Sequence, residues 1–161
     1  MAVTTQKSTE YTNQSATPPT IQDSTVLAGK VRCAFFTHDQ SGAGDATSSV
    51  ALCKLPAGRV RLLAAQSKAY VNWTTASATL DLGWDAYVDI DGAAVAADPN
   101  GIDDGLSVDT VGYQTFGSAL VASGGTKVFE SKEGVVIRAT SQDTAIADGD
   151  DLVGCLLYVV E

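Results

Sequence analysis

The segment Ala78–Gly92, ATLDLGWDAYVDIDG, alternates between apolar and polar residues at nearly every position. Successive side chains of a β-strand point to opposite faces, so a period of two predicts a strand with one buried face and one wet face. The apolar positions run from Ala78 to Ile90, and the wet face carries Asp81, Asp85 and Asp89. This segment predicts a half-buried sheet.

The same kind of pattern recurs along the chain from Lys30 onward, and no segment shows the 3.6-residue period of an amphipathic helix. Gly- and Asp-rich turn signals such as SGAGDATSS, DPNGIDDG and ADGDD separate the apolar runs. We predict an all-β protein with a single β-sandwich over residues 29–161, a jelly roll of about eight strands. The predicted strands are Lys30–Thr37, Ser49–Leu55, Arg59–Trp73, Ser77–Ile90, Val111–Phe116, Lys127–Ser131, Val135–Ala139 and Leu152–Val160. Between two of them, ESKEGVVIRA predicts a hairpin with Gly134 in its turn.

Residues 1–28 differ from the rest of the chain because they are rich in Thr, Ser and Gln and contain only scattered apolar residues. Such a segment cannot form a core of its own, so we predict an extended N-terminal arm. It has neither a basic start nor an apolar run, and we therefore expect no signal peptide and a cytosolic origin.

The strand aspartates Asp81, Asp85 and Asp89 could hold a metal, act as acid and base, or keep a surface soluble. They follow one another at four-residue intervals, which places neighbours about 13 Å apart on a strand. A glycosidase pair needs carboxyl groups within about 5–10 Å. We interpret these aspartates as a solvated outer face.

A second acidic stretch, Asp98–Asp109, is dense in carboxylates and contains Asp98, Asn100, Asp103 and Asp104. It lacks the ligand spacing and the closing Glu of an EF-hand. Asp and Asn also favour turns through bonds to their own backbone, so we expect a plain loop here. Irregular calcium sites do occur on sandwich loops, and calcium binding stays open at this point.

No set of residues predicts catalysis, a metal centre or a cofactor. His38 is the only histidine, which excludes a histidine cluster, and we expect it in a surface loop. There is no GxSxG elbow and no phosphate-binding loop. Cys33, Cys53 and Cys155 lie in apolar, strand-like contexts, and we expect reduced, buried thiols. The sequence favours a protein that is not an enzyme.

The formal net charge of −9 is unevenly distributed. Residues 1–70 carry seven Lys and Arg against four Asp and Glu, whereas residues 71–161 carry three against fifteen. We therefore expect a mildly basic side, built largely by Arg59, Arg61 and Lys68, and a strongly acidic side. The basic residues could dock onto an acidic partner or be ordinary outward charges. Without a basic cluster or a long apolar stretch, we expect neither nucleic-acid nor membrane binding.

The order of these segments resembles that of the small proteins encoded beside the major capsid gene of many tailed bacteriophages. The resembling parts are the Thr/Ser-rich arm, GKVRCAFFTHDQSGAGDATSSVALCKLPAGRVRLLAAQSKAY, LDLGWDAYVDIDGAAVAADPNGIDDGLSV and FESKEGVVIRATSQDTAIADGDDLVGCLLYVV. Proteins of this kind are head decoration, or cement, proteins: β-sandwiches that clamp neighbouring major capsid subunits on the outside of the virion. The resemblance implies a structural role on the capsid exterior, assembly in the host cytoplasm and a homo-oligomer, either a dimer or a trimer.

If this resemblance holds, the partner-binding residues are the apolar residues of the arm and the cations of the basic side. The candidates are Val3, Tyr11, Ile21, Val26, Leu27, Arg59, Arg61 and Lys68.

An alternative interpretation is a jelly-roll receptor- or carbohydrate-binding module of a phage fibre or baseplate. Trp73, Trp84, Tyr87 and Tyr113 could offer stacking surfaces to such a ligand. Trp84 lies on the apolar face of its strand, which leaves Tyr87 as the aromatic residue of the wet face there.

Overall fold

The computed structural model describes residues 16–18, 30–142 and 144–161. The chain divides into two units, Met1–Lys30 and Val31–Glu161, and the fold below is that of the second unit. The arm predicted over residues 1–28 lies outside the described residues, apart from residues 16–18.

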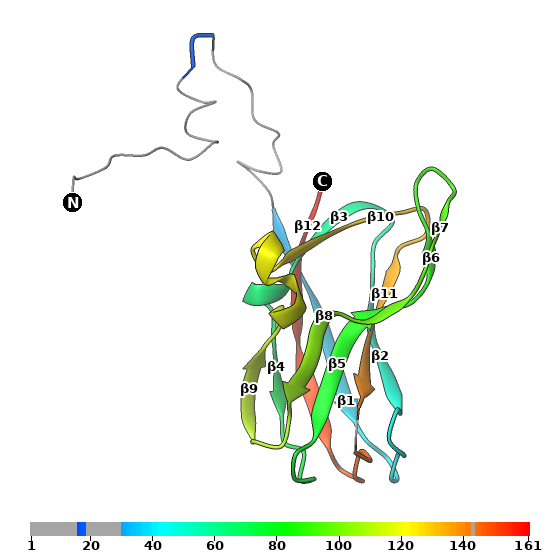
Figure 1. Ribbon diagram of the computed structural model, residues 1–161, viewed down its shortest axis with the longest axis vertical. Coiled ribbons are helices and arrows are strands. Elements are labelled where there is room, and N and C mark those ends of the chain that lie inside the picture. The colour runs from blue at the N-terminus through cyan, green and yellow to red at the C-terminus, as the bar shows by residue number, and fades with distance from the viewer. Residues whose placement is uncertain (1–15, 19–29, 143) are drawn as a thin grey trace, which may run out of the picture. The chain divides into compact units, whose positions relative to one another are not determined.

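Two β-sheets stack against each other in the second unit (Figure 1). The first sheet consists of β1 (Val31–Asp39), β3 (Gly58–Leu63), β4 (Lys68–Val71), β9 (Gly112–Thr115), β10 (Thr126–Ser131) and β12 (Asp151–Val160). The second sheet consists of β2 (Ser49–Leu55), β5 (Thr79–Trp84), β8 (Asp98–Ser107) and β11 (Val135–Ser141). A short hairpin, β6 (Tyr87–Val88) and β7 (Ala94–Val95), extends from one end of the sandwich.

Two pairs of strands in the first sheet are halves of bent strands. Both β3 and β4 pair with β12, and the 3-10 helix η1 (Ala64–Gln66) separates them. On their other side β10 pairs with β3 and β9 pairs with β4, and the helical segment η2 (Ser118–Ser123) lies between β9 and β10 in the chain. With each bent strand counted once, both sheets have four strands.

The pairing of these eight strands is nested. The first strand pairs with the last (β1 with β12), the second with the seventh (β2 with β11), the third with the sixth (β3–β4 with β9–β10) and the fourth with the fifth (β5 with β8). Every one of these pairs is antiparallel, and the two members of a pair share a sheet. This is the jelly-roll arrangement, so the predicted fold class is confirmed.

The core fills the space between the sheets with the residues that alternation turns inward. Val60, Leu62, Leu82 and Leu156 are each at most 1% exposed. Trp84 packs edge-to-face on Phe129, with ring centroids 5.3 Å apart, and joins the two sheets. Because inward residues from both sheets interdigitate, the sandwich closes without a disulfide.

Several predicted elements differ from the structure. The strand predicted over Ser77–Ile90 ends at Trp84, and the strand predicted over Arg59–Trp73 is broken by η1. The stretch Asp98–Asp109, predicted as a loop, forms β8 as far as Ser107. The hairpin predicted at Gly134 is wrong, because β10 belongs to the first sheet and β11 to the second. This turn is a corner between the two sheets.

Candidate functional site

The predicted basic residues lie on the outer face of the first sheet. Val60 and Leu62 point inward on β3, so Arg59 and Arg61 point outward; the same alternation turns Lys68 outward on β4. The structure therefore brings the three cations to one face, with η1 between the arginines and the lysine.

Arg59 and Arg61 hold the C-terminal residue of the chain. The Nε atom of Arg61 lies 2.7 Å from Oε1 of Glu161, and Arg59 pairs with the other carboxylate oxygen of Glu161. Arg59 also lies 3.2 Å from Glu130 on the neighbouring strand β10. The Glu161 side chain is only 3% exposed, whereas that of Arg59 is 52% exposed. The arginines thus fix the end of β12 and still present guanidinium N–H groups to solvent.

Lys68 lies beside a group of aromatic residues. Its ammonium group is 5.3 Å from the centre of the Tyr113 ring, a cation–π distance. Tyr70 and Tyr113 pack edge-to-face with centroids 5.7 Å apart. Together with Phe35 they line a shallow pocket of about 250 Å³.

This pocket is part of an apolar outer surface that the register of β1, β12, β4 and β9 defines. Residues paired across the four strands share a face, so the surface consists of two rows. The first row contains Phe35, Cys155, Lys68 and Thr115, and the second contains Thr37, Val153, Tyr70 and Tyr113. We call these eight residues the aromatic face. Phe35 is 81% exposed and Tyr113 is 72% exposed.

The aromatic face was not predicted from the sequence, although a signal was present. CAFF and GCLLYVV are continuous apolar runs, whereas a strand with one wet face alternates. Such runs are typical of strands that are covered on both faces. In the second unit the core covers the inner face of β1 and β12 through residues such as Phe36 and Leu156, whereas Phe35 and Val153 on the outer face are exposed.

The aspartates predicted as a solvated outer face all accept hydrogen bonds from other groups of the chain. Asp81 is 7% exposed and accepts hydrogen bonds from the Gly105 backbone N–H, at 2.9 Å, and from Gln142 Nε2, at 2.8 Å. Asp85 forms a two-bond ion pair with Arg138. Asp89 accepts hydrogen bonds from the backbone of its own turn. The interpretation of these residues as a solvated face is therefore wrong for Asp81, and only in part right for Asp85.

The carboxylates of the second acidic stretch do not converge on a common point. Asp103 is 2% exposed, and it accepts hydrogen bonds from the Gly117 N–H at 2.6 Å and the Ser118 N–H at 3.1 Å. Asp104, the next residue, is exposed. Across residues 16–18, 30–142 and 144–161, no group of three or more His, Cys, Asp or Glu side chains is placed to hold a metal ion.

The cysteines and the histidine occupy ordinary strand positions. All three cysteines are free and half-buried. Burial raises the pKa of Cys33 to about 11, with a further contribution from the neighbouring Cys155, and burial likewise raises the pKa of Cys53 to about 11. His38 lies on β1 rather than in a loop, with its Nε2 3.0 Å from Oε1 of Gln40.

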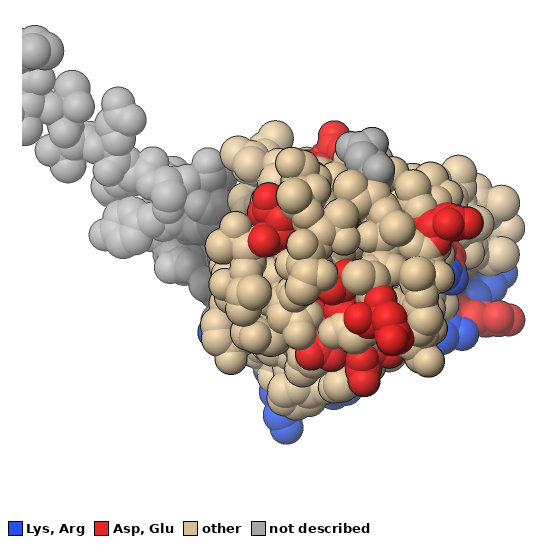
Figure 2. All heavy atoms as spheres, turned by 90° about the horizontal axis from the view of Figure 1, so that it is seen from below, with Lys and Arg blue, Asp and Glu red and all other residues tan. Residues whose placement is uncertain are grey.

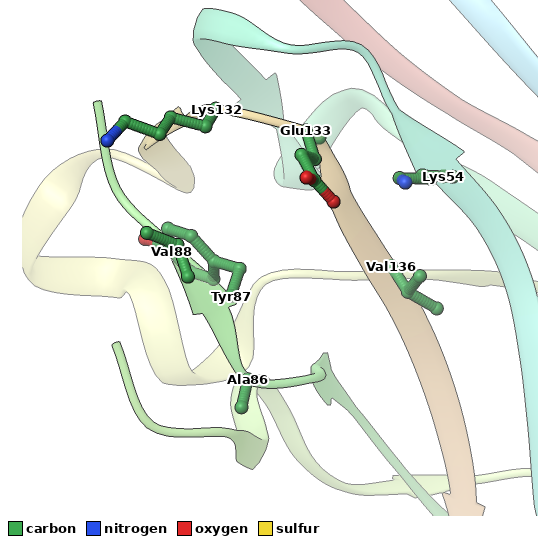
Figure 3. A pocket seen from close by; sticks show the side chains of 8 residues that line it. Lys54, Ala86, Tyr87, Val88, Lys132, Glu133 and Val136 are labelled. Atoms are coloured by element: carbon green, nitrogen blue, oxygen red, sulfur yellow. The ribbon is translucent and has the colours of Figure 1, made fainter. Parts of the chain in front are cut away.

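A second pocket, of about 360 Å³, lies beside the β6–β7 hairpin. Tyr87 and Val88 of this hairpin form one side of the pocket, Lys54 and Val136 form the other, and Glu133 lies between them (Figure 3). Burial raises the pKa of Tyr87, and the carboxylates of Asp89 and Glu130 add to the effect.

The two tryptophans considered for stacking belong to the core. Trp73 is 2% exposed and Trp84 is 7% exposed, so neither ring is open to a ligand. The prediction of stacking surfaces is therefore wrong for both tryptophans.

One end of the sandwich is acidic, as expected from the charge asymmetry. The loops β1–β2, β4–β5, β8–β9 and β11–β12 meet there, and red carboxylates gather at the centre of this end while the cations lie at its margin (Figure 2). The described aspartates in these loops or at their ends are Asp39, Asp45, Asp109, Asp148, Asp150 and Asp151.

The arm residues predicted to bind a partner, Val3, Tyr11, Ile21, Val26 and Leu27, lie outside the described residues. No helix among the described residues has the length and apolar character needed to cross a membrane.

No protein-family model matches the chain, and no curated protein matches it. Six chains of solved structures do match. A chain from the structure of infectious bursal disease virus, Gt strain, has a TM-score of 0.50 at 9% identity, over 83% of this chain and 33% of that chain. A chain of the cyanophage Pam1 capsid asymmetric unit has a TM-score of 0.49 at 16% identity, over 83% of this chain and 86% of that chain. The VP2 subviral particle of infectious bursal disease virus gives 0.48 at 11% identity, with 83% and 33% covered.

The chain spans about a third of the length of these infectious bursal disease virus chains. At 9% identity, the match to the Gt-strain chain shows a shared fold. That fold is the β-sandwich.

Proposed function

We propose that this protein is a structural, non-enzymatic component of a phage virion that binds the outer surface of the capsid and clamps neighbouring major capsid subunits. The observation that carries the proposal is the jelly-roll sandwich, a fold shared with a chain of a virus particle. The order of the sequence segments, which resembles that of head decoration proteins, supports it independently.

Physically, a clamp needs two attachments that are held on one chain. The arm of 28 residues spans up to roughly 90 Å when extended, at about 3.3 Å per residue, so it can reach an adjacent capsid subunit. A second attachment through the sandwich raises the effective concentration of the first. Apolar arm residues such as Tyr11, Ile21 and Leu27 would each contribute about 1–3 kcal/mol on burial, before the cost of ordering the arm.

The two arginines of the basic side, Arg59 and Arg61, are the proposed sandwich contacts with an acidic capsid surface. Arg59 retains solvent exposure despite its two ion pairs, and Arg61 lies on the same face of β3. The acidic end would then face away from the capsid, since like charge would oppose its approach to such a surface.

Co-sedimentation with capsids that lack the protein tests this function. We expect saturable binding of the full chain and weaker binding of a variant that starts at Gly29. Arg59→Gln should weaken binding at low salt, whereas Lys54→Gln, which removes an exposed cation from β2 of the second sheet, should not. Failure of the full chain to bind would contradict the proposal, and undiminished binding of the shortened variant would contradict the role of the arm.

A ligand-binding module of a phage fibre or baseplate is a second candidate, favoured by the pocket at Tyr87. That pocket combines an aromatic ring with Lys54, Lys132 and Glu133, groups able to hydrogen-bond a sugar. Binding of the isolated protein to a glycan array, lost in Tyr87→Ala, would favour this candidate over the capsid clamp.

A further inference from the structure

The two sheets of the sandwich have different outer faces. On the second sheet, the outward positions of β11 and β5 pair Thr140 with Asp81, and Arg138 forms its ion pair with Asp85. The outer face of the first sheet has the aromatic face instead, in which Lys68 is the one charged residue among eight. An antiparallel sheet that faces water on one side is normally polar there. The part of the first sheet that carries the aromatic face is therefore built as if both of its faces were covered.

We propose that the aromatic face is a self-association surface, covered in solution by another copy of this chain. Interfaces between permanently associated identical subunits are more apolar than those of transient complexes and resemble a domain core cut in half. A surface with Phe35, Tyr70 and Tyr113 around a single lysine has that composition. This inference goes beyond the proposed function and does not depend on capsid binding.

The charge distribution favours a second copy at this face over other parts of the sandwich. Residues 30–161 carry nine Lys and Arg against seventeen Asp and Glu, a net charge of −8. Two copies repel each other wherever carboxylates meet, most strongly at the acidic end (Figure 2). The aromatic face contains no carboxylate, so two copies can approach there without opposing like carboxylates.

The shape and the area of the face also suit a second copy. Phe35 protrudes, and the pocket of about 250 Å³ beside it offers a hollow for a partner side chain. Sheets that pack face to face interdigitate their side chains in this way. Phe35 and Tyr113 are the strongly exposed rings, so two copies contribute four of them. At about 150–250 Å² per aromatic side chain, reduced for partial burial, these rings amount to roughly 450–750 Å² of apolar area. That is a substantial part of the roughly 1,200–2,000 Å² of a stable interface, before Val153, Tyr70 and the flanking Val31 are added.

Lys68 fits the same role. Its ammonium group already lies over Tyr113, and a ring from the second copy would give it another aromatic neighbour. Aromatic rings can therefore take the place of a carboxylate partner for Lys68 when the aromatic face is buried.

The test is the mass of the full-length protein in solution, measured by sedimentation velocity over a wide range of protein concentration. We expect a dimer or a trimer for the natural chain. Phe35→Ser and Tyr113→Ser should each weaken self-association at least tenfold, because buried aromatic anchors dominate such interfaces. Ile90→Ser is the matched control, since Ile90 is an exposed apolar residue in the turn of the β6–β7 hairpin, and it should leave the mass unchanged.

Because Phe35 and Tyr113 are exposed, both serine variants should keep the far-ultraviolet circular dichroism spectrum and thermal midpoint of the unassociated sandwich. A natural chain that stays monomeric at every concentration would overturn the proposal. An oligomer whose mass and affinity are unchanged in both variants would overturn it as well. Capsid co-sedimentation of the same proteins is a separate measurement, because variants that stay monomeric can still be tested for capsid binding. A failure of self-association is thereby distinguished from a failure of the proposed function.

Discussion

Asp85 and Arg138 form the best-defined ion pair of the second sheet. The Nε and Nη2 atoms of Arg138 lie 2.6 and 2.7 Å from the two carboxylate oxygens of Asp85. These hydrogen bonds hold the pKa of Asp85 below its ordinary value and raise the pKa of Arg138. The Arg138 and Asp85 side chains are 34% and 35% exposed, so solvent screens the pair and its contribution to stability is modest.

Asp85→Asn should lower the free energy of unfolding by about 0.5–1 kcal/mol at pH 7. Because the folded-state pKa of Asp85 is depressed, the stabilisation is present above the unfolded-state pKa and is lost as the pH falls through the folded-state value. Urea unfolding at several pH values checks this: the gap between variant and natural protein should shrink below about pH 4. Asp91→Asn, an exposed aspartate in the β6–β7 turn, is the control and should show no such gap.

Asp103→Asn should destabilise the sandwich by about 1–3 kcal/mol, because the amide offers one neutral oxygen in place of a carboxylate that accepts three hydrogen bonds from Gly117 and Ser118. The Asp103 carboxylate joins β8 to the start of η2 through the N–H groups of Gly117 and Ser118. Thermal unfolding of Asp103→Asn and Asp104→Asn is the measurement, since Asp104 is the exposed neighbour. Equal melting temperatures for the two variants would show that the hydrogen bonds of Asp103 do not stabilise this junction.

At the scale of single residues, the sequence predicts correctly which positions of a strand face the core. It does not predict which contacts the outward-facing residues make. Leu80, Leu82 and Trp84 are buried as the alternation requires. Asp81 is buried as well, because Gly105 and Gln142 lie over it from distant parts of the chain. Periodicity within one strand carries no information about those neighbours.

At the scale of elements, the corner between β10 and β11 is one of the connections that carry the chain from one sheet to the other. Gly134 has a φ of +90°, and its N–H donates to the Ser131 hydroxyl at 2.9 Å. A Cβ atom at this position would lie 2.2 Å from the Leu55 carbonyl oxygen. Both the backbone conformation and the space therefore require glycine.

Gly134→Ala should cost about 3 kcal/mol or more in the free energy of unfolding. Gly149→Ala provides a matched comparison, since Gly149 has a φ of +83° and a methyl group there would meet no other atom within 4 Å. That variant should cost only the conformational term, about 1–2 kcal/mol. Chemical denaturation of both variants gives the comparison, and equal losses would mean that the close approach of Leu55 is unimportant.

Strand positions were predictable where apolar residues are frequent and not where they are rare. The bounds of β2 match the prediction, and those of β10, β11 and β12 differ by a residue or two. The strand β8 was missed because Asp, Gly and Pro dominate its sequence, DPNGIDDGLS. One of these glycines serves packing: a Cβ on Gly101 would lie 2.3 Å from the Trp84 ring. In the sequence alone, a glycine that close packing requires cannot be distinguished from a glycine in a turn.

At the scale of the whole molecule, the described sandwich presents three distinct surfaces. The acidic loops form one end (Figure 2), the ion pairs of Arg59 and Arg61 close the C-terminal end of β12, and the aromatic face covers part of the first sheet. Charge asymmetry along the sequence was enough to predict an acidic side, and Arg59 and Arg61 of the predicted basic side pair with Glu130 and Glu161. The aromatic face depends on the register of four strands, which no single segment of sequence reveals.

The decisive experiment for the proposed clamp is a cryo-electron microscopy reconstruction of capsids saturated with the full-length protein. We predict density of the size of this sandwich on the outer surface, above the junctions between neighbouring capsid subunits, and absent from capsids prepared without the protein. Density confined to the tail or baseplate, or no added density at saturating concentration, would contradict the proposal that this jelly roll clamps the capsid.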